Sequence, residues 1–133
     1  ALIQVECHPY FPQTQLKELL AKHGIALRAW YPLGGRDNKA ILDEPVIASL
    51  AEKYGKTAAQ IIMRWHVQQG NIVIPGSKTP AHIADNINIF DFALNDNDME
   101  AIATLDRNKP FYERTPENIA FYATWHPDVE GQK

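Results

Sequence analysis

Two segments of this chain carry polar or aromatic side chains directly after short apolar runs. Residues 25–34 (IALRAWYPLG) run into an aromatic turn, and residues 71–80 (NIVIPGSKTP) run into a turn with two hydroxyls and a lysine. Backbone N–H groups, hydroxyls and an amine can bind anionic oxygens, and flat aromatic rings can hold a planar ligand. Parallel α/β proteins bind ligands beyond the carboxyl ends of their strands. The two segments therefore predict a ligand site.

Strand-like and helix-like segments alternate along the chain. Short apolar or β-branched runs predict strands at residues 2–7, 25–31 and 71–74. Strands separated by helices indicate a parallel sheet with right-handed crossovers. Capping residues and apolar side chains at helical spacing predict helices that begin near Leu16, Asp43, Thr57, Thr79 and Asn95.

The ends of several predicted helices carry specific signals. Gly24 and Gly70 are placed to close helices in a left-handed conformation. Thr57 and Gln60 have the spacing of a capping box. After the cap and first-turn proline at residues 79–80, three apolar residues are expected on the buried side of the helix: Ile83, Ile87 and Phe90.

The order of elements leaves two parallel α/β folds open, a doubly wound sheet and a (βα)8 barrel. No GxGxxG turn follows a predicted strand, and no GxxxxGKS/T motif is present, which disfavours a Rossmann or P-loop fold. We therefore predict an α/β fold that is a partial (βα)8 barrel of parallel strands with crossover helices. From residue 108 onward helical periodicity fails, and prolines mix with aromatic residues. That tail is expected to be a loop or an ordered wrap.

Composition bounds the size, partners and location of the protein. With 133 residues, 45% of them hydrophobic, the chain can bury one core at most. A net charge of −3 with scattered Lys and Arg argues against nucleic acid and anionic membranes as partners. Apolar stretches are too short for a membrane span, and no leader is visible. The single cysteine, Cys7, excludes an internal disulfide and favours the cytoplasm. No metal site is predicted.

Five strings of residues carry a resemblance to a known family. Residues 4–10 (QVECHPY), 29–34 (AWYPLG), 74–80 (IPGSKTP), 85–87 (DNI) and 105–108 (LDRN) closely resemble the C-terminal part of aldo-keto reductases, in particular bacterial diketogulonate reductase-like members. The match runs in order over essentially the whole chain. It implies a (βα)8 barrel of which this chain supplies the last three strands. It also implies NADPH as cofactor and reduction of aldehydes and ketones to alcohols by hydride transfer.

The same resemblance indicates which parts of the family's barrel this chain lacks. Residues 1–133 would form the C-terminal portion of one barrel domain, with residues 108–133 as its C-terminal loop or tail. The family's catalytic Asp, Tyr, Lys and His come from earlier segments, so no catalytic residue carries over. Since the chain begins at Ala1 inside an apolar run, we expect the N-terminal half of the barrel to be a missing partner and the chain alone to be inactive. His8 could be a general acid, but a hydrogen-bonding role at the strand end is favoured.

The resemblance assigns the nicotinamide and pyrophosphate contacts. Gln4 matches the glutamine that binds the nicotinamide carboxamide; the alternative is an inward polar residue of the barrel. Trp30 matches the aromatic that stacks on the nicotinamide ring, whereas an aromatic at a strand end is otherwise a core residue. Tyr31, Leu33 and Gly34 match the turn along the pyrophosphate, the alternative being a solvated loop.

The resemblance also assigns the adenosine end of the cofactor. Ser77, Lys78 and Thr79 precede a helix N-terminus, which favours an anion such as the adenosine 2′-phosphate of NADPH. Asp85 and Asn86 match the acidic residue and asparagine that reach the adenine, although both could be exposed helix polars.

Two positions depart from the family pattern at the presumed phosphate site. Many relatives have Lys where Gly76 stands and Arg where His82 stands, and His82 is retained as a candidate cofactor contact. Charge-assisted contacts to phosphate are among the stronger hydrogen bonds. NAD(H) is therefore possible in place of NADP(H). Ile3 also replaces a common asparagine, and nothing in the sequence explains that change.

The tail aromatics lie where the family carries a loop over the substrate pocket. The resemblance assigns Phe111, Tyr112 and Trp125 to this substrate loop, and a small carbonyl compound is the expected substrate. Two functions remain open: the cofactor-binding portion of an NADP(H)-dependent reductase, or a non-catalytic, nucleotide-binding or self-associating partial barrel. Three parallel strands alone leave open edges and uncovered apolar faces, so a lone monomer is not expected.

Overall fold

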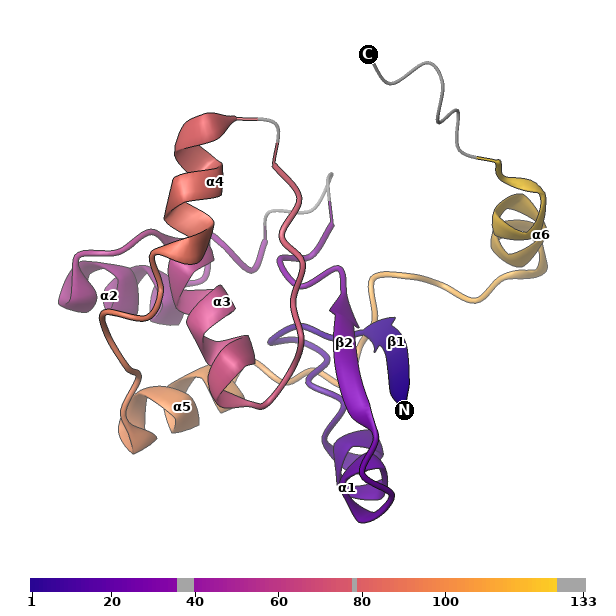
Figure 1. Ribbon diagram of the computed structural model, residues 1–133, viewed down its shortest axis with the longest axis horizontal. Coiled ribbons are helices and arrows are strands. Elements are labelled where there is room, and N and C mark those ends of the chain that lie inside the picture. Colours follow the sequence, from indigo (N-terminus) through magenta and orange to yellow (C-terminus); the bar gives the residue numbers. More distant parts are fainter. Residues whose placement is uncertain (36–39, 78, 127–133) are drawn as a thin grey trace.

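The chain opens with a parallel βαβ unit. In the computed structural model, which describes residues 1–35, 40–77 and 79–126, β1 (Leu2–Glu6) is followed by α1 (Thr14–Lys22) and β2 (Ala26–Trp30). Leu2 pairs with Ala26 and Glu6 with Trp30 in a parallel register, and Figure 1 shows the two strands side by side with α1 at one end. The carboxyl ends of both strands therefore lie at one edge of the sheet.

The two faces of this sheet differ in chemistry, because successive side chains of a strand point to opposite faces. Cys7, Leu20, Leu27 and Ala29 form a buried cluster on the face covered by α1. Gln4, Glu6, Arg28 and Trp30 fall on the other face by the strand alternation and the register. One face therefore supplies core and the other supplies polar and aromatic groups.

The third predicted strand, at residues 71–74, is wrong as a strand. Ile72 makes only an isolated parallel bridge with Arg28, in which its N–H donates to the Leu27 carbonyl and its carbonyl accepts from the Ala29 N–H, both at 2.8 Å. Pro75 has no N–H to extend the ladder. In the described part of the chain no further strand pairs with the outer edge of this segment. It therefore lies beside β2 without becoming a regular strand.

Three helices build the larger core beside the sheet. α2 (Pro45–Tyr54), α3 (Ala58–Gln68) and α5 (Asp96–Ala103) bury apolar side chains against one another. The capping box at Thr57 and Gln60 is confirmed. So are the left-handed glycines, with φ of 61° at Gly24 and 73° at Gly70. The core cluster comprises Tyr10, Ile41, Ile47, Leu50, Ile61, Ile62, Trp65, Leu94, Ile102 and Leu105.

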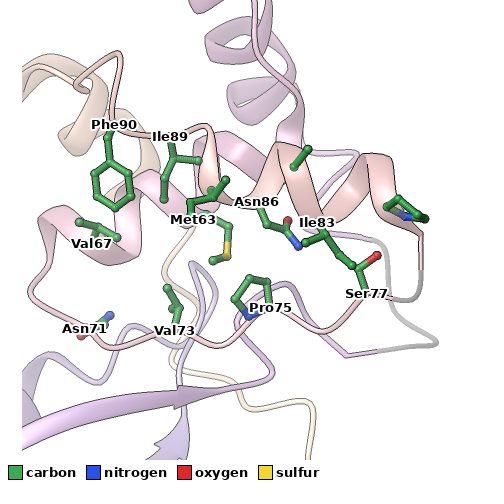
Figure 2. Close-up of a pocket in the computed structure, with 13 residues that line it drawn as sticks. Met63, Val67, Asn71, Val73, Pro75, Ser77, Ile83, Asn86, Ile89 and Phe90 are labelled. Carbon is green, nitrogen blue, oxygen red and sulfur yellow. The ribbon is translucent and has the colours of Figure 1, made fainter.

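The predicted burial of the apolar side of α4 (Pro80–Ile87) is wrong. Ile83, Ile87 and Phe90 are 55%, 73% and 66% exposed. These side chains line an apolar groove of about 810 Å³, which we call the α4 groove, between α4, α3 and residues 71–77. Figure 2 shows Met63, Val73, Pro75 and Ile83 around it. The helical spacing correctly found the apolar face, but nothing in the described chain covers it.

The tail is helical in part, which the sequence analysis did not predict. α6 (Pro116–Thr124) begins at Thr115, whose hydroxyl accepts from the Asn118 N–H at 3.2 Å. In Figure 1, α6 stands apart from the other helices. The missed signal is a Thr-Pro pair of the same kind as the one recognised before α4. None of the helices that the structure describes is both long and apolar enough to cross a membrane.

Gln60 links the start of α3 to the end of α4, and this link can be tested. Its Oε1 accepts from the Thr57 N–H at 2.9 Å, while its Nε2 donates to the carbonyls of Asp85 and Asn88 at 3.0 and 3.2 Å. We expect Gln60→Ala to cost about 2–3 kcal/mol in urea unfolding, against about 1 kcal/mol for Thr57→Ala, which removes the cap alone. Equal costs for the two variants would show that the bonds to α4 contribute no stability.

Candidate functional site

A first cavity lies on the polar face of the sheet, beside the carboxyl ends of its strands. Gln4, Trp30 and Tyr112 line this space of about 650 Å³, which we call the strand-end cavity. The structure thus brings together two of the residues predicted at the nicotinamide with one predicted in the substrate loop. The remaining lining residues are Val5, Glu6, Phe11, Gln13, Pro110, Glu113 and Arg114.

The Trp30 ring forms a wall between this cavity and the next. It stacks on Tyr31 with ring centroids 3.9 Å apart and an interplanar angle of 18°. Tyr112 meets the same indole edge-on at 5.5 Å. Tyr31 does not line the strand-end cavity. One face of the indole therefore lies against Tyr31.

A second cavity lies on the other side of the aromatic pair. Tyr31, Leu33 and Ser77 line a groove of about 670 Å³, which we call the turn groove, between the turn after β2 and residues 74–77. Gln4 and Trp30 thus line the strand-end cavity, whereas Ser77 lines the turn groove. The residues fall into two cavities because the Trp30–Tyr31 stack stands between them. The other lining residues are Pro32, Gly35, Ile74, Pro75 and Gly76.

The turn after β2 has an unusual backbone. Tyr31 has φ of 54°, a left-handed conformation that an aromatic residue rarely adopts, and Gly34 has φ of 92°. The Gly34 N–H donates to the Tyr31 carbonyl at 2.9 Å and closes the turn. Strained conformations of this kind persist where the surrounding structure holds them, and they concentrate at functional sites.

A buried polar network on α3 and at Asn71 binds the backbone of this turn. His66 on α3 has no exposed surface, and its Nε2 lies 3.0 Å from the Pro32 carbonyl while its Nδ1 lies 3.0 Å from the Asn71 amide nitrogen. The carbonyl needs a donor and the amide NH2 is a donor, so the imidazole is neutral with its proton on Nε2. Burial lowers the pKa of His66 to about 3, which keeps it neutral. The sequence analysis assigned no role to His66, although a histidine among apolar helix positions was a visible signal.

The predicted phosphate residues lie at the start of α4. The Thr79 N–H donates to the Ser77 hydroxyl at 3.1 Å, and the Thr79 side chain makes no capping hydrogen bond to the helix. His82 is exposed one turn further on. Lys78 lies outside the described residues. The helix N-terminus thus keeps N–H groups without a side-chain cap, which suits an anion but does not identify one.

The remaining predicted residues are spread more widely. Asp85 and Asn86 are half-buried on α4, where Asn86 lines the α4 groove. Phe111 lines neither the strand-end cavity nor the turn groove, and packs its ring on His8 with centroids 4.6 Å apart. Trp125 is 56% exposed at the end of α6. The structure therefore brings only Tyr112, of the three predicted loop aromatics, to the strand-end cavity.

Comparison with known proteins identifies the family. The model of the aldo/keto reductase family matches residues 1–107. The chain belongs to this family, whose members are oxidoreductases built as (βα)8 barrels, and its fold is a part of such a barrel.

Individual relatives support this family assignment. An aldo-keto reductase of Mycolicibacterium smegmatis is 49% identical over 109 residues, which cover 82% of this chain and 38% of that protein. Methylglyoxal reductase DkgA of Escherichia coli K12 is 45% identical over 106 residues, covering 80% and 38%. The chain therefore spans about two fifths of the length of such relatives.

Solved structures give the same result. A mutant of Gox0644 in complex with NADPH superposes with a TM-score of 0.77 at 42% identity, over 80% of this chain and 38% of that chain. MGS-M4, an aldo-keto reductase from a deep-sea metagenome library of the Medee basin, gives a TM-score of 0.81 at 34% identity, over 84% and 41%.

The buried neutral His66 makes stability depend on pH. In the unfolded chain histidine binds a proton near pH 6.5, whereas the folded chain does not until pH falls to about 3. Stability should therefore fall as pH is lowered through this window, by about 2–3 kcal/mol from this residue between pH 6.5 and 4.5. Urea unfolding at several pH values measures it.

The matched comparison uses His66→Gln and the exposed His23→Gln. The first variant should unfold with a flatter pH profile than the wild type, and the second should leave the profile unchanged. Burial also lowers the pKa of His8, but His8 is present in every protein compared, so its contribution cancels. If stability of His66→Gln depends on pH as steeply as that of the wild type, His66 is not the buried neutral histidine that lowers stability in acid.

Proposed function

We propose that this chain is the cofactor-binding portion of an NADP(H)-dependent aldo-keto reductase of the cytoplasm, which reduces aldehydes and ketones by hydride transfer. In this proposal residues 1–133 form the C-terminal portion of one barrel domain, and the N-terminal portion supplies the catalytic tetrad. The observation that carries the proposal is the strand-end cavity, where Gln4 and Trp30 lie together beside the carboxyl end of the sheet. The NADPH complex of the similar Gox0644 mutant supports the choice of cofactor.

The donor set fits the parts of a nicotinamide dinucleotide. Gln4 offers an amide donor and acceptor to the carboxamide, and the Trp30 ring, which lines the same cavity, offers an aromatic surface for the nicotinamide ring. The turn groove offers backbone N–H groups to the pyrophosphate, and the start of α4 offers Ser77 and Thr79 to a further phosphate. When bound, the cofactor would supply the hydride. This chain's residues bind and orient it.

The simplest test completes the barrel. In a fusion, which we call the completed barrel, this chain replaces the corresponding C-terminal segment of DkgA. We expect the completed barrel to oxidise NADPH with 4-nitrobenzaldehyde, while the isolated chain shows no turnover because it lacks the family's catalytic residues. The decrease in NADPH absorbance measures the activity of both proteins. Turnover by the isolated chain, or a folded completed barrel without activity, would contradict the proposal.

Trp30→Ala in the completed barrel tests the stacking role. Stacking of a base or ring on an aromatic side chain is worth about 1–3 kcal/mol, so NADPH affinity should fall by about 5- to 150-fold. Phe92, whose ring packs with Tyr54 away from the cavities, provides the matched control as Phe92→Ala. If both variants bind NADPH like the parent protein, Trp30 does not contact the ring.

The preference between NADPH and NADH can be tested by substitutions at Gly76 and His82. A Cβ added at Gly76 meets no atom within 4 Å, and His82 is exposed, so longer cations fit at both positions. We expect Gly76→Lys with His82→Arg to tighten NADPH binding by about tenfold or more, because each cation adds a charge-assisted phosphate contact. NADH affinity should stay unchanged. Equal tightening for both cofactors would show that these positions do not face the 2′-phosphate.

A second candidate function is self-association of the partial barrel, with or without nucleotide binding. The α4 groove favours it, because Ile83, Ile87 and Phe90 expose an apolar surface beside the outer edge of residues 71–74. The rest of the barrel would cover the same surface if it is supplied. Sedimentation of the isolated chain separates the cases: a discrete dimer that binds NADPH supports self-association, and aggregation contradicts it. Ile87→Glu should disperse such a dimer.

A further inference from the structure

The turn after β1 supplies no residue with an assigned cofactor contact, although its sequence ECHPY belongs to the strings that mark the family. Glu6 is 7% exposed and His8 has no exposed surface. The segment that leads from α5 to α6 runs against this turn. The Arg107 N–H donates to the Tyr10 carbonyl at 3.0 Å, and the Arg107 guanidinium lies 3.9 Å above the Tyr10 ring. Two segments about a hundred residues apart in sequence are thus packed together.

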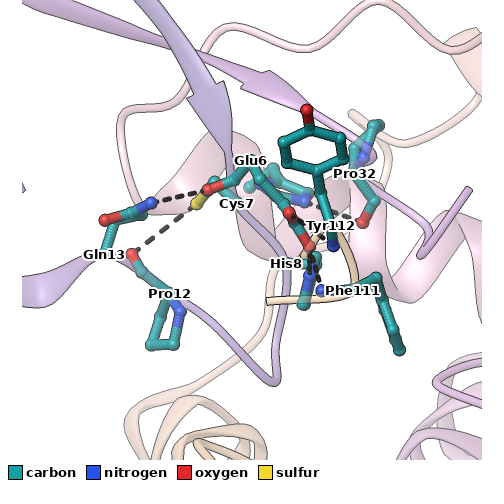
Figure 3. A network of polar contacts seen from close by, with 9 residues as sticks. Glu6, Cys7, His8, Pro12, Gln13, Pro32, Phe111 and Tyr112 are labelled. Carbon is teal, nitrogen blue, oxygen red and sulfur yellow. Dashed lines mark hydrogen bonds and ion pairs between the residues drawn. The ribbon is translucent and has the colours of Figure 1, made fainter. Parts of the chain in front are cut away.

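The Glu6 carboxylate is the centre of this contact. Its Oε1 accepts from the Phe111 N–H at 2.5 Å and lies 2.8 Å from His8 Nε2, while its Oε2 accepts from the Tyr112 N–H at 3.1 Å. Figure 3 shows the two backbone N–H groups and the imidazole converging on one carboxylate. Charge-assisted hydrogen bonds of this kind are stronger than neutral ones. Glu6 therefore holds two consecutive residues of the tail by their backbone, whatever their side chains are.

His8 completes the anchor. The carboxylate accepts hydrogen bonds only, so His8 donates from Nε2, and its ring packs on Phe111 with centroids 4.6 Å apart. The Nδ1 atom is buried with no hydrogen-bond partner in the described structure. Burial lowers the pKa of His8, which favours the neutral ring with Nδ1 as a bare acceptor. The imidazole is thus committed to Glu6 and Phe111 and does not face the strand-end cavity, which it does not line.

The held segment closes the strand-end cavity. Pro110, Tyr112, Glu113 and Arg114 all line that cavity, and the Tyr112 ring lies edge-on to Trp30. Glu6 binds the Tyr112 N–H, and Pro110 and Glu113 directly neighbour the two residues that Glu6 binds. The position of this cavity wall therefore depends on one carboxylate at the strand end.

We propose that Glu6, supported by His8, is a positioning residue that fixes residues 110–114 over the strand-end cavity and thereby sets which substrates enter it. The substrate half of this inference rests on the proposed function; the anchoring half does not. Glu6 is not assigned a catalytic role, because its two oxygens already accept from three donors. The backbone anchor leaves the side chains of the loop free to vary.

Hydrogen exchange of the 133-residue chain tests the anchor. In Glu6→Ala, the amides of Phe111 and Tyr112 should exchange about 10- to 100-fold faster, because their acceptor is gone, while amides of α3 remain protected. Glu6→Gln, which keeps the volume and one acceptor oxygen, should give a smaller increase. The exposed Glu100→Gln is the control and should change nothing. Unchanged exchange at both amides in a folded Glu6→Ala protein would overturn the proposal.

The completed barrel tests the effect on substrates. Glu6→Gln should raise KM for a bulky aromatic aldehyde at least tenfold more than KM for a small aldehyde. A folded variant with faster exchange but an unaltered KM ratio would refute the substrate half. If the parent completed barrel shows no turnover, the proposed function fails, yet the exchange experiment still decides whether Glu6 holds the loop.

Discussion

The arrangement of both cavities depends on the parallel register of β1 and β2. Pairing of Gln4 with Arg28 and of Glu6 with Trp30 puts the polar and aromatic residues on one face and ends both strands at one edge. A slip of one residue would move one strand's side chains to the opposite face. Gln4 and Trp30 would then no longer share a cavity. Cys7, Leu27 and Ala29 form a buried cluster on the other face. A slip would expose these apolar side chains to water, so their burial stabilises the observed register.

Buried polar side chains hold the two loops that leave the strand ends. His66 bonds the Pro32 carbonyl in the turn after β2, and Glu6 bonds the tail that passes the end of β1. In each case a side chain on a regular element, or at its end, fixes the backbone of an irregular segment. Loops placed by a rigid scaffold are where binding sites concentrate. A buried hydrogen bond is costly to break, so these loops have one preferred position.

Local signals in the sequence predicted the elements well. Two strands, the capping box at Thr57 and Gln60 and the left-handed glycines were all predicted correctly, because each depends on a few neighbouring residues. The resemblance was confirmed at the level of the family, and its assignments to single residues remain proposals. The strand at residues 71–74 and the burial of Ile83 and Ile87 were wrong because no strand pairs with the outer edge of residues 71–74 and no segment covers α4 in the described chain. Glu6 and His66 were missed as anchors since their partners lie far away in sequence, which no local pattern reports.

A crystal structure of the completed barrel with NADPH bound would show whether the strand-end cavity holds the nicotinamide. We expect the nicotinamide ring against the Trp30 ring, with its carboxamide at Gln4, and the adenosine phosphate beside Ser77 at the start of α4. A cofactor whose nicotinamide lies away from the strand-end cavity, with Gln4 and Trp30 both out of contact, would contradict it.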